Sequence, residues 1–259
     1  MSGELDFRPK MLGLVCNWCC YGGADLCGVS RFQYPPFIRL VRVMCSGRVD
    51  LLHLLRALAD GMDAVFVGGC HINDCHYVTE GNYDAIAMIE VCRELLRRIG
   101  IRPERVRLEW VSAGEGIRFA AIMNEYAEQV RTLGPLGRAD GEGLDAAELG
   151  RRLEAATRLV PFARLALTGR LRPAVRTEEA YRRFFAGDEF RRLFDELLGE
   201  RLAIGRVLLA LRDGPRSAAE LARGLGWSAS EVARHLRNSS RHGWIRFDAA
   251  GGRYALAEG

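Results

Sequence analysis

Three short hydrophobic runs near the amino terminus each end in a cysteine. They are MLGLVC (11–16), FIRLVRVMC (37–45) and DAVFVGGC (63–70). Continuous apolar runs of this length, rich in Leu, Val, Ile and Phe, are typical of strands buried on both faces of a parallel sheet. Helix-like stretches lie between them. The order strand–helix–strand therefore predicts an α/β fold.

The same pattern continues to about residue 135. RVRLEWV (105–111) predicts a fourth strand, and helices are expected after Asp50, over 83–99 and over 115–132, each ending at a glycine. We expect a small four-stranded parallel sheet of the flavodoxin or Rossmann type, with right-handed crossovers. This unit is predicted to span residues 9–136.

A glycine- and charge-rich stretch, GRADGEG (137–143), predicts a domain boundary. The next segment, 144–200, has a helical pattern with many arginines and is interrupted at Pro161 and Pro173. Arginine on a helix more often marks a solvated face than a binding patch. We interpret this part as a helical linker segment.

Residues 201–259 carry their own pattern. A helix near 201–212 precedes two capping boxes, which open at Ser217 and Ser228. WIRF and RYAL then alternate about a Gly-Gly turn and predict a hairpin. Three helices and a hairpin resemble a winged helix-turn-helix domain, whose second capped helix usually lies in the major groove. The candidate contacts on that helix are Arg234, His235, Arg237, Asn238 and Arg241.

Composition narrows the class of protein. The 259 residues are 49% hydrophobic and 27% charged, with no run of the roughly 18 apolar residues that a membrane helix needs. The first residues do not resemble a signal peptide, so we expect a cytoplasmic protein. Residues 151–259 contain 21 of the 37 basic residues, all arginine, and 13 of the 33 acidic residues. Residues 1–150 therefore contain 16 basic and 20 acidic residues. This asymmetry suggests two modules with different partners.

Five of the eight cysteines are the candidate site: Cys16, Cys19, Cys45, Cys70 and Cys75. Ligands bind at the carboxyl edge of a parallel sheet, so thiols at three strand ends are expected to converge. Four thiolates hold a 2Fe-2S or 4Fe-4S cluster, and structural zinc accepts the same set. The alternative is that these are small buried hydrophobic side chains. We expect four of the five to be iron ligands and predict no catalytic residue.

The other three cysteines and the nearby side chains have plainer interpretations. Cys92 lies on the apolar face of a predicted helix and is expected in the core, and we expect neither Cys20 nor Cys27 to be a ligand. A supporting or loop role is favoured over ligation for His71 and His76.

Five motifs occur in order with natural spacing: CNWCCYGGADLCGVSRFQYPP, RVMCSGRVD, GGCHINDCHY, GNYDA and LEWVSAGEG. Together they resemble the delta (iron–sulfur) subunit family of methyl-viologen-reducing hydrogenases over about residues 9–135. The resemblance implies an α/β domain with a 2Fe-2S cluster and, motif by motif, the five cysteines named above as its candidate ligands.

The resemblance also implies electron transfer within a hetero-oligomer, without substrate chemistry of the chain's own. Such subunits relay electrons from a hydrogenase, formate dehydrogenase or similar enzyme to the HdrA-like flavin subunit of a heterodisulfide-reductase-like complex, where flavin-based electron bifurcation occurs. Residues after about 137 lie outside the resemblance.

Two other functions stay open. The basic carboxyl-terminal half motivates an iron–sulfur redox-sensing regulator that binds DNA through the winged helix. A CxxC dithiol oxidoreductase is a weaker possibility, because the glycine-rich stretch after Cys20 does not favour a thioredoxin-like helix start. For the carboxyl-terminal domain, docking or dimerisation is favoured over DNA binding.

Overall fold

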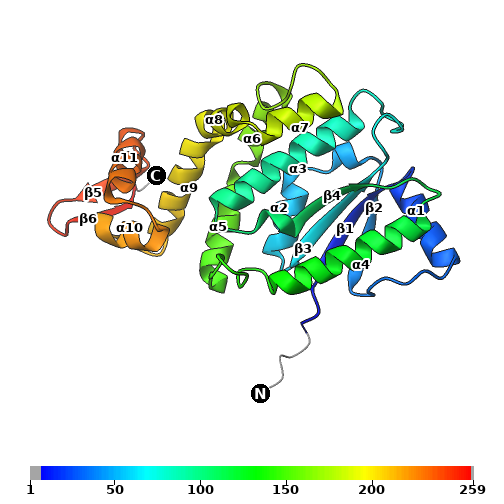
Figure 1. Ribbon diagram of the computed structural model, residues 1–259. Coiled ribbons are helices and arrows are strands. Elements are labelled where there is room, and N and C mark those ends of the chain that lie inside the picture. The colour runs from blue at the N-terminus through cyan, green and yellow to red at the C-terminus, as the bar shows by residue number, and fades with distance from the viewer. Residues whose placement is uncertain (1–6, 258–259) are drawn as a thin grey trace.

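The structure is a computed structural model that describes residues 7–257 (Figure 1). Its first part alternates strands with helices. The elements are β1 (Met11–Cys16), α1 (Cys20–Val29), β2 (Ile38–Val43), a 3-10 turn (Ser46–Arg48), α2 (Leu51–Ala59), β3 (Ala64–Gly69), α3 (Gly81–Arg98), a second 3-10 turn (Pro103–Arg105), β4 (Val106–Trp110) and α4 (Gly116–Leu133).

The four strands form one parallel sheet in the order β2-β1-β3-β4. This order confirms the predicted four-stranded parallel sheet. The chain moves from β1 outward to β2, then crosses back to β3 on the other side of β1. The direction of winding therefore switches between β1 and β3, and such switch points are where open α/β sheets bind ligands.

Helices cover both faces of the sheet over its central strands, which explains why β1 and β3 are continuously apolar. Helices α1 and α4 lie on one face, where Val15 and Phe66 pack against Phe119 and its neighbours (Figure 1). Helices α2 and α3 lie on the other face, against Leu14 and Val65. Alternate residues of β1 and β3 thus enter different cores. The edge strand β2, contrary to the expectation, is not buried on both faces, because Arg39, Val41 and Arg42 are exposed.

Residues 144–200 form helices that pack onto the α/β unit. They are α5 (Ala146–Arg158), α6 (Val160–Thr168), α7 (Glu178–Ala186), α8 (Asp188–Phe194) and a π-helical turn (Asp195–Gly199). Pro161 lies in the first turn of α6, where a missing N–H costs nothing. Leu153, Tyr181 and Phe194 belong to the same buried cluster as α2 and α3, so the segment shares a core with the sheet. The predicted domain boundaries stay a prediction.

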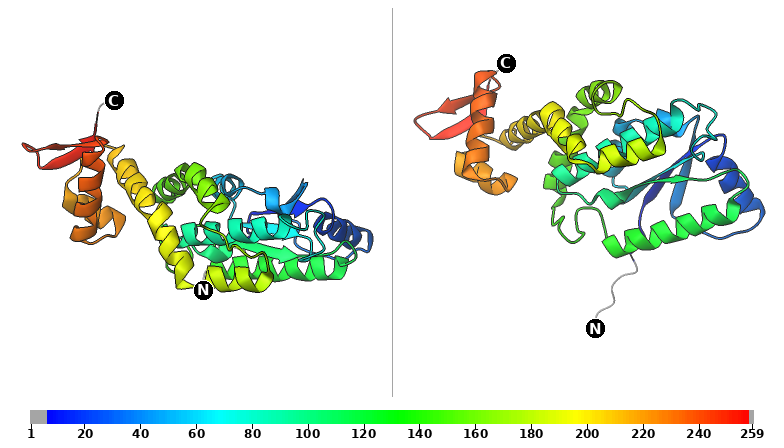
Figure 2. Two further views of the ribbon diagram at one scale, coloured as in Figure 1. Left: turned by 90° about the horizontal axis from the view of Figure 1, so that it is seen from above. Right: turned by 45° about the horizontal axis from the view of Figure 1, so that its top comes forward.

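The carboxyl-terminal elements form the predicted winged helix. They are α9 (Glu200–Leu211), α10 (Ala218–Leu225), α11 (Ala229–Arg241) and the antiparallel hairpin of β5 (Ile245–Asp248) and β6 (Arg253–Leu256). Both predicted capping boxes are present, at Ser217 and Ser228. This domain lies at one end of the molecule and is joined to the rest through α9 (Figures 1 and 2). None of the helices within 7–257 is long and apolar enough to cross a membrane.

A buried ion pair ties the stretch 137–143 to the sheet. Glu142 accepts hydrogen bonds from Arg105, at 2.7 Å from Nε and 2.8 Å from Nη2, and both side chains are fully buried. Glu142 also accepts hydrogen bonds from the backbone N–H groups of Arg102, Gly137 and Ala139. The charge of each partner is therefore compensated in the interior.

Glu142→Gln is expected to destabilise the protein by about 3–5 kcal/mol, because it leaves the Arg105 charge buried without its partner. Urea unfolding at pH 7 measures this change. The matched control is Glu128→Gln, which removes an exposed carboxylate beside Arg131 and is expected to change stability by less than about 1 kcal/mol.

The same pair predicts a pH dependence. Burial alone would raise the pKa of Glu142, but the hydrogen bonds from Arg105 and the backbone outweigh it and hold the pKa below its ordinary value. A lowered pKa stabilises the fold above the unfolded-state value, about 4.3, and this contribution is lost as pH falls through the folded-state value. The difference in the free energy of unfolding between wild type and Glu142→Gln should therefore become smaller below about pH 4. A constant difference from pH 7 to pH 3 would contradict this account.

Candidate metal centre

The ends of three neighbouring strands bring the candidate cysteines to one edge of the sheet. Cys16 is the last residue of β1, Cys70 follows β3 directly, and Cys45 lies two residues after β2. Cys19 is the residue before α1, and Cys75 lies in the loop between β3 and α3. Since β1 is paired with both β2 and β3, the predicted convergence follows from the strand order.

The closest thiols form two groups. Cys70 interacts with both Cys16 and Cys19, and Cys45 interacts with Cys75. The Sγ atoms of Cys16 and Cys70 are 3.5 Å apart, although 54 residues separate them in the chain. Cys45 and Cys75 both face Gly81, the first residue of α3: a Cβ atom placed there would lie 2.9 Å and 2.5 Å from their Sγ atoms. Within residues 7–257, no three or more His, Cys, Asp or Glu side chains are grouped closely enough to hold one metal ion.

Backbone N–H groups point at the sulfur atoms. The Sγ of Cys16 accepts from the N–H of Cys19 and from that of Cys20, both at 3.4 Å, and the Sγ of Cys75 accepts from the N–H of Tyr77 at 3.4 Å. Cys20 opens α1, so the donors to Cys16 belong to a helix start, where the backbone dipoles favour negative charge. The site is therefore suited to thiolates.

The thiols titrate as coupled groups. The hydrogen bond with Cys70 lowers the pKa of Cys16 to about 6 against the opposing effect of burial, and the same bond raises the pKa of Cys70. One proton is thus retained by the pair near neutral pH. Burial raises the pKa of Cys45 to about 11. Binding a metal to this set would displace these protons.

The remaining cysteines are buried away from such donors. Cys92 is fully buried in α3, as predicted, and burial raises its pKa to about 12. Burial also raises the pKa of Cys20, whose Sγ would lie 2.2 Å from a Cβ placed on Gly68. The Sγ of Cys27 donates to the carbonyl oxygen of Phe32 at 3.4 Å.

The two nearby histidines contact groups other than sulfur. Nε2 of His71 lies 2.6 Å from a carboxylate oxygen of Glu115, which also accepts the N–H of Ser112. The ring of His76 stacks on Trp18, with centroids 4.4 Å apart. Both contacts hold the loops that carry the cysteines, in line with the supporting role expected for these histidines.

Two residues that contact the candidate cysteines were not identified from the sequence. Gly81 permits the start of α3 to approach Cys45 and Cys75, and Asn82, which is buried, donates from Nδ2 to the carbonyl oxygen of Cys70 at 2.7 Å. Both lie in the motif GNYDA, where a glycine followed by an amide at a predicted helix start could have marked them as candidates. Whether they contact the cysteines depends on where the loop after Cys70 places the start of α3.

Comparison with known proteins divides the chain into two matched regions. The family described as "Methyl-viologen-reducing hydrogenase, delta subunit" matches residues 11–134, and a helix-turn-helix family matches residues 201–243. The second match agrees with the winged helix-turn-helix formed by α9 to β6.

Several curated proteins are similar to the first region. An iron-sulfur subunit of the F420-non-reducing hydrogenase of Archaeoglobus profundus is 48% identical over 130 residues, which cover 50% of this chain and 94% of the relative. The corresponding vhc iron-sulfur subunit of Methanococcus voltae is 48% identical over 130 residues, 50% of this chain and 90% of the relative. One subunit of the ferredoxin/F420H2-dependent CoB-CoM heterodisulfide reductase of Methanosarcina acetivorans is 43% identical over 129 residues, 50% of this chain but 16% of that longer protein.

Gly81→Ala is expected to lower the iron and acid-labile sulfide bound per chain, because the new methyl group would push Cys45 and Cys75 away from their positions. Gly28→Ala is the control, since a Cβ at that position in α1 meets nothing within 4 Å. Equal iron and sulfide contents in the wild type and both variants would show that the two thiols do not take part in a metal site.

Proposed function

Because the chain belongs, over residues 11–134, to the delta-subunit family of methyl-viologen-reducing hydrogenases, we propose that it is an electron-transfer iron–sulfur subunit of an oxidoreductase complex. The observation that carries the proposal is the convergence of five cysteines at the switch point of the sheet, with Cys16 and Cys70 in contact. The relatives whose names describe iron-sulfur subunits support the same chemistry.

The pairing of the thiols supports a 2Fe-2S cluster over a single zinc ion. A cluster with two irons takes two protein ligands on each iron, whereas a zinc ion needs four around one point. We assign Cys16 and Cys70 to one iron and Cys45 and Cys75 to the other. Bound in this way, the cluster would accept and donate one electron at a time.

Cys19 is the fifth thiol in this assignment. It is partly exposed, whereas the other four are at most 4% exposed. Its own N–H donates to the Sγ of Cys16, so its backbone supports the site even without its sulfur. Burial raises the pKa of its thiol, as it does for Cys45, so the assignment of Cys19 as the fifth thiol rests on its exposure.

The surface beside the thiols suits docking of a protein partner. Trp18, Met44, Tyr77 and Val78 follow or precede the candidate cysteines in the chain and are 42–58% exposed. Trp18 and Tyr77 both contact the ring of His76, and exposed apolar and aromatic side chains of this kind mark interaction sites. A partner seated there would exclude water from the site and bring its own redox centre close to it.

The flavin subunit of a heterodisulfide-reductase-like complex is the proposed acceptor or donor on this surface. In the Methanosarcina relatives, the similar region is part of a longer chain that is named as a component of heterodisulfide reductase. Such fusion keeps the two parts at short range, which a separate subunit must achieve by docking. A hydrogenase or other dehydrogenase is the proposed second partner, and bifurcation belongs to the flavin subunit.

Serine substitution tests the ligand assignment. Cys16→Ser, Cys45→Ser, Cys70→Ser and Cys75→Ser are each expected to lose most of the bound iron and the electron paramagnetic resonance signal of the reduced protein. Cys19→Ser should retain both, and Cys92→Ser is the control for a buried thiol outside the site. Zinc in place of iron in anaerobically prepared wild type would refute the cluster, and loss of iron in Cys19→Ser would refute the assignment of four.

Met44→Glu tests the docking surface, because it places a charge beside Cys45 on a side chain that is 58% exposed. The affinity for the flavin subunit is expected to fall at least about tenfold while the iron content stays unchanged. Leu165→Glu, also at an exposed apolar position but on α6, is the control. The measurement is binding of the tagged chain to the flavin subunit purified from the same source. Equal binding by both variants would place the partner elsewhere.

A redox-sensing DNA-binding regulator is the second candidate, favoured by the helix-turn-helix match at 201–243. Helix α11 would supply Arg234, Arg237 and Arg241, which are exposed. The side chains of His235 and Asn238 are both hydrogen-bonded to Glu200 on α9, so they are not available to contact DNA bases. Salt-dependent DNA affinity without a stable oxidoreductase complex would favour this candidate.

A further inference from the structure

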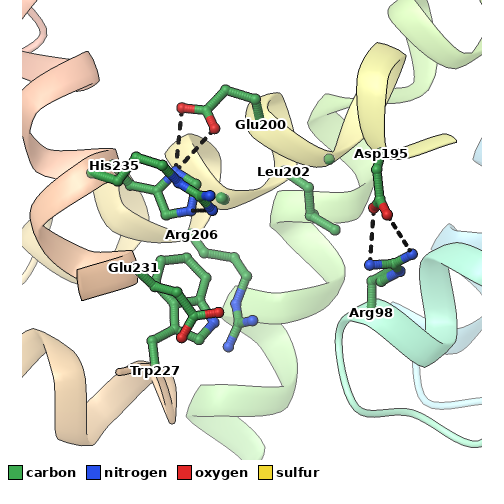
Figure 3. Close-up of a pocket in the computed structure, with 11 residues that line it drawn as sticks. Arg98, Asp195, Glu200, Leu202, Arg206, Trp227, Glu231 and His235 are labelled. Carbon is green, nitrogen blue, oxygen red and sulfur yellow. Dashed lines mark hydrogen bonds and ion pairs between the residues drawn. The ribbon is translucent and has the colours of Figure 1, made fainter. Parts of the chain in front are cut away.

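An open cavity of about 500 Å³ lies where α9 meets the winged helix and the end of α3. Figure 3 shows Arg206 extending from α9 into the space beside Trp227. Sites for small ligands have volumes of about 300–1,000 Å³. The cavity is large enough for a metabolite, and it is far along the chain from the cysteines.

Arg206 is a buried cation without a carboxylate partner. The residue is 9% exposed. Its Nη2 donates to the carbonyl oxygen of Leu225 at 3.1 Å, and its buried Nε has no hydrogen-bond partner. Within residues 7–257, no Asp or Glu oxygen lies within 4.0 Å of the guanidinium nitrogens of Arg206, the distance that defines an ion pair. The ring of Trp227, whose centroid is 4.9 Å from Cζ, and the more distant carboxylate of Glu148 compensate part of the charge. Burial and the like charge of Arg152 nevertheless lower the pKa of Arg206 to about 10. A buried charge with so little compensation is costly.

The three carboxylates that line the cavity are each held by other groups. Asp195 is paired with Arg98 at 2.9 Å, and Glu200 accepts from Asn238 at 2.7 Å and lies 3.1 Å from His235. Glu231 accepts from the backbone N–H and the hydroxyl of Ser228 in a capping box. None of them is left to neutralise Arg206.

We propose that this cavity binds a small oxyanion-bearing ligand, a carboxylate or a phosphate, through the guanidinium of Arg206. The positive charge of Arg206 at the wall of the cavity matches an oxyanion, for which charge-assisted hydrogen bonds are short and strong. Arg234 at the rim adds a second positive charge. The ligand would link α9 to the turn that precedes α11, the helix that carries the exposed arginines of the winged helix.

Thermal unfolding of the full chain in inorganic phosphate and in succinate, each against sodium chloride of equal ionic strength, tests the proposal. The melting temperature is expected to rise saturably in at least one of the two, and the arm that responds identifies the oxyanion. No rise beyond chloride in either arm would overturn the proposal.

Arg206→Met removes the charge at similar volume and should abolish the rise, with stability in chloride equal to or above that of the wild type. Arg237→Met, at an exposed position on α11, should leave the rise intact. Arg206→Lys keeps the charge with fewer donors, and its half-saturating concentration should be about tenfold higher. It also serves as the test if Arg206→Met does not fold. A rise that persists unchanged in Arg206→Met or Arg206→Lys would assign the effect to another site.

Discussion

Parallel pairing of β1 with both of its neighbours is the constraint on which the cysteine site depends. Residues far apart in the chain share one edge because β1 lies between β2 and β3, in a register that pairs Cys16 with Val43 and Val15 with Gly68. Two further requirements act at short range. Gly68 leaves room for α1 to begin beside β3, and Gly81 does the same for α3 beside Cys45 and Cys75. The starts of two helices can thus approach the thiols, with their backbone dipoles oriented to favour negative charge.

Local patterns were sufficient to predict the elements and the candidate cysteines. The apolar runs ending at Cys16 and Cys70 marked the strand ends, and the capping boxes at Ser217 and Ser228 marked two helix starts, because both features are determined by neighbouring residues. The arrangement of the thiols in two groups, Cys16 and Cys19 with Cys70 and Cys45 with Cys75, could not be predicted in this way. It depends on how the loop before α3 folds back on the strand ends.

Buried charges were also beyond the reach of sequence patterns. Glu142 lies in a stretch whose composition indicates solvent exposure, and Arg105 begins the predicted fourth strand, yet the two meet in the interior because 137–143 folds back onto Arg105. Arg206 occurs in a helix that has many apolar residues, and nothing in its neighbourhood distinguishes it from an arginine on a solvated face. In both cases burial is decided by tertiary packing, which periodicity does not describe.

Helix α9 contributes residues to two hydrophobic cores, and this fixes the position of the winged-helix domain. Leu202 and Leu209 pack in the core shared with α2 and α3, whereas Val207 and Leu211 pack in that of the winged helix. The winged helix is therefore fixed to the α/β unit by packing as well as by the chain. It lies at the opposite end of the molecule from α1 (Figures 1 and 2). The carboxyl-terminal domain therefore does not cover the edge with the cysteines, which leaves the proposed docking surface accessible.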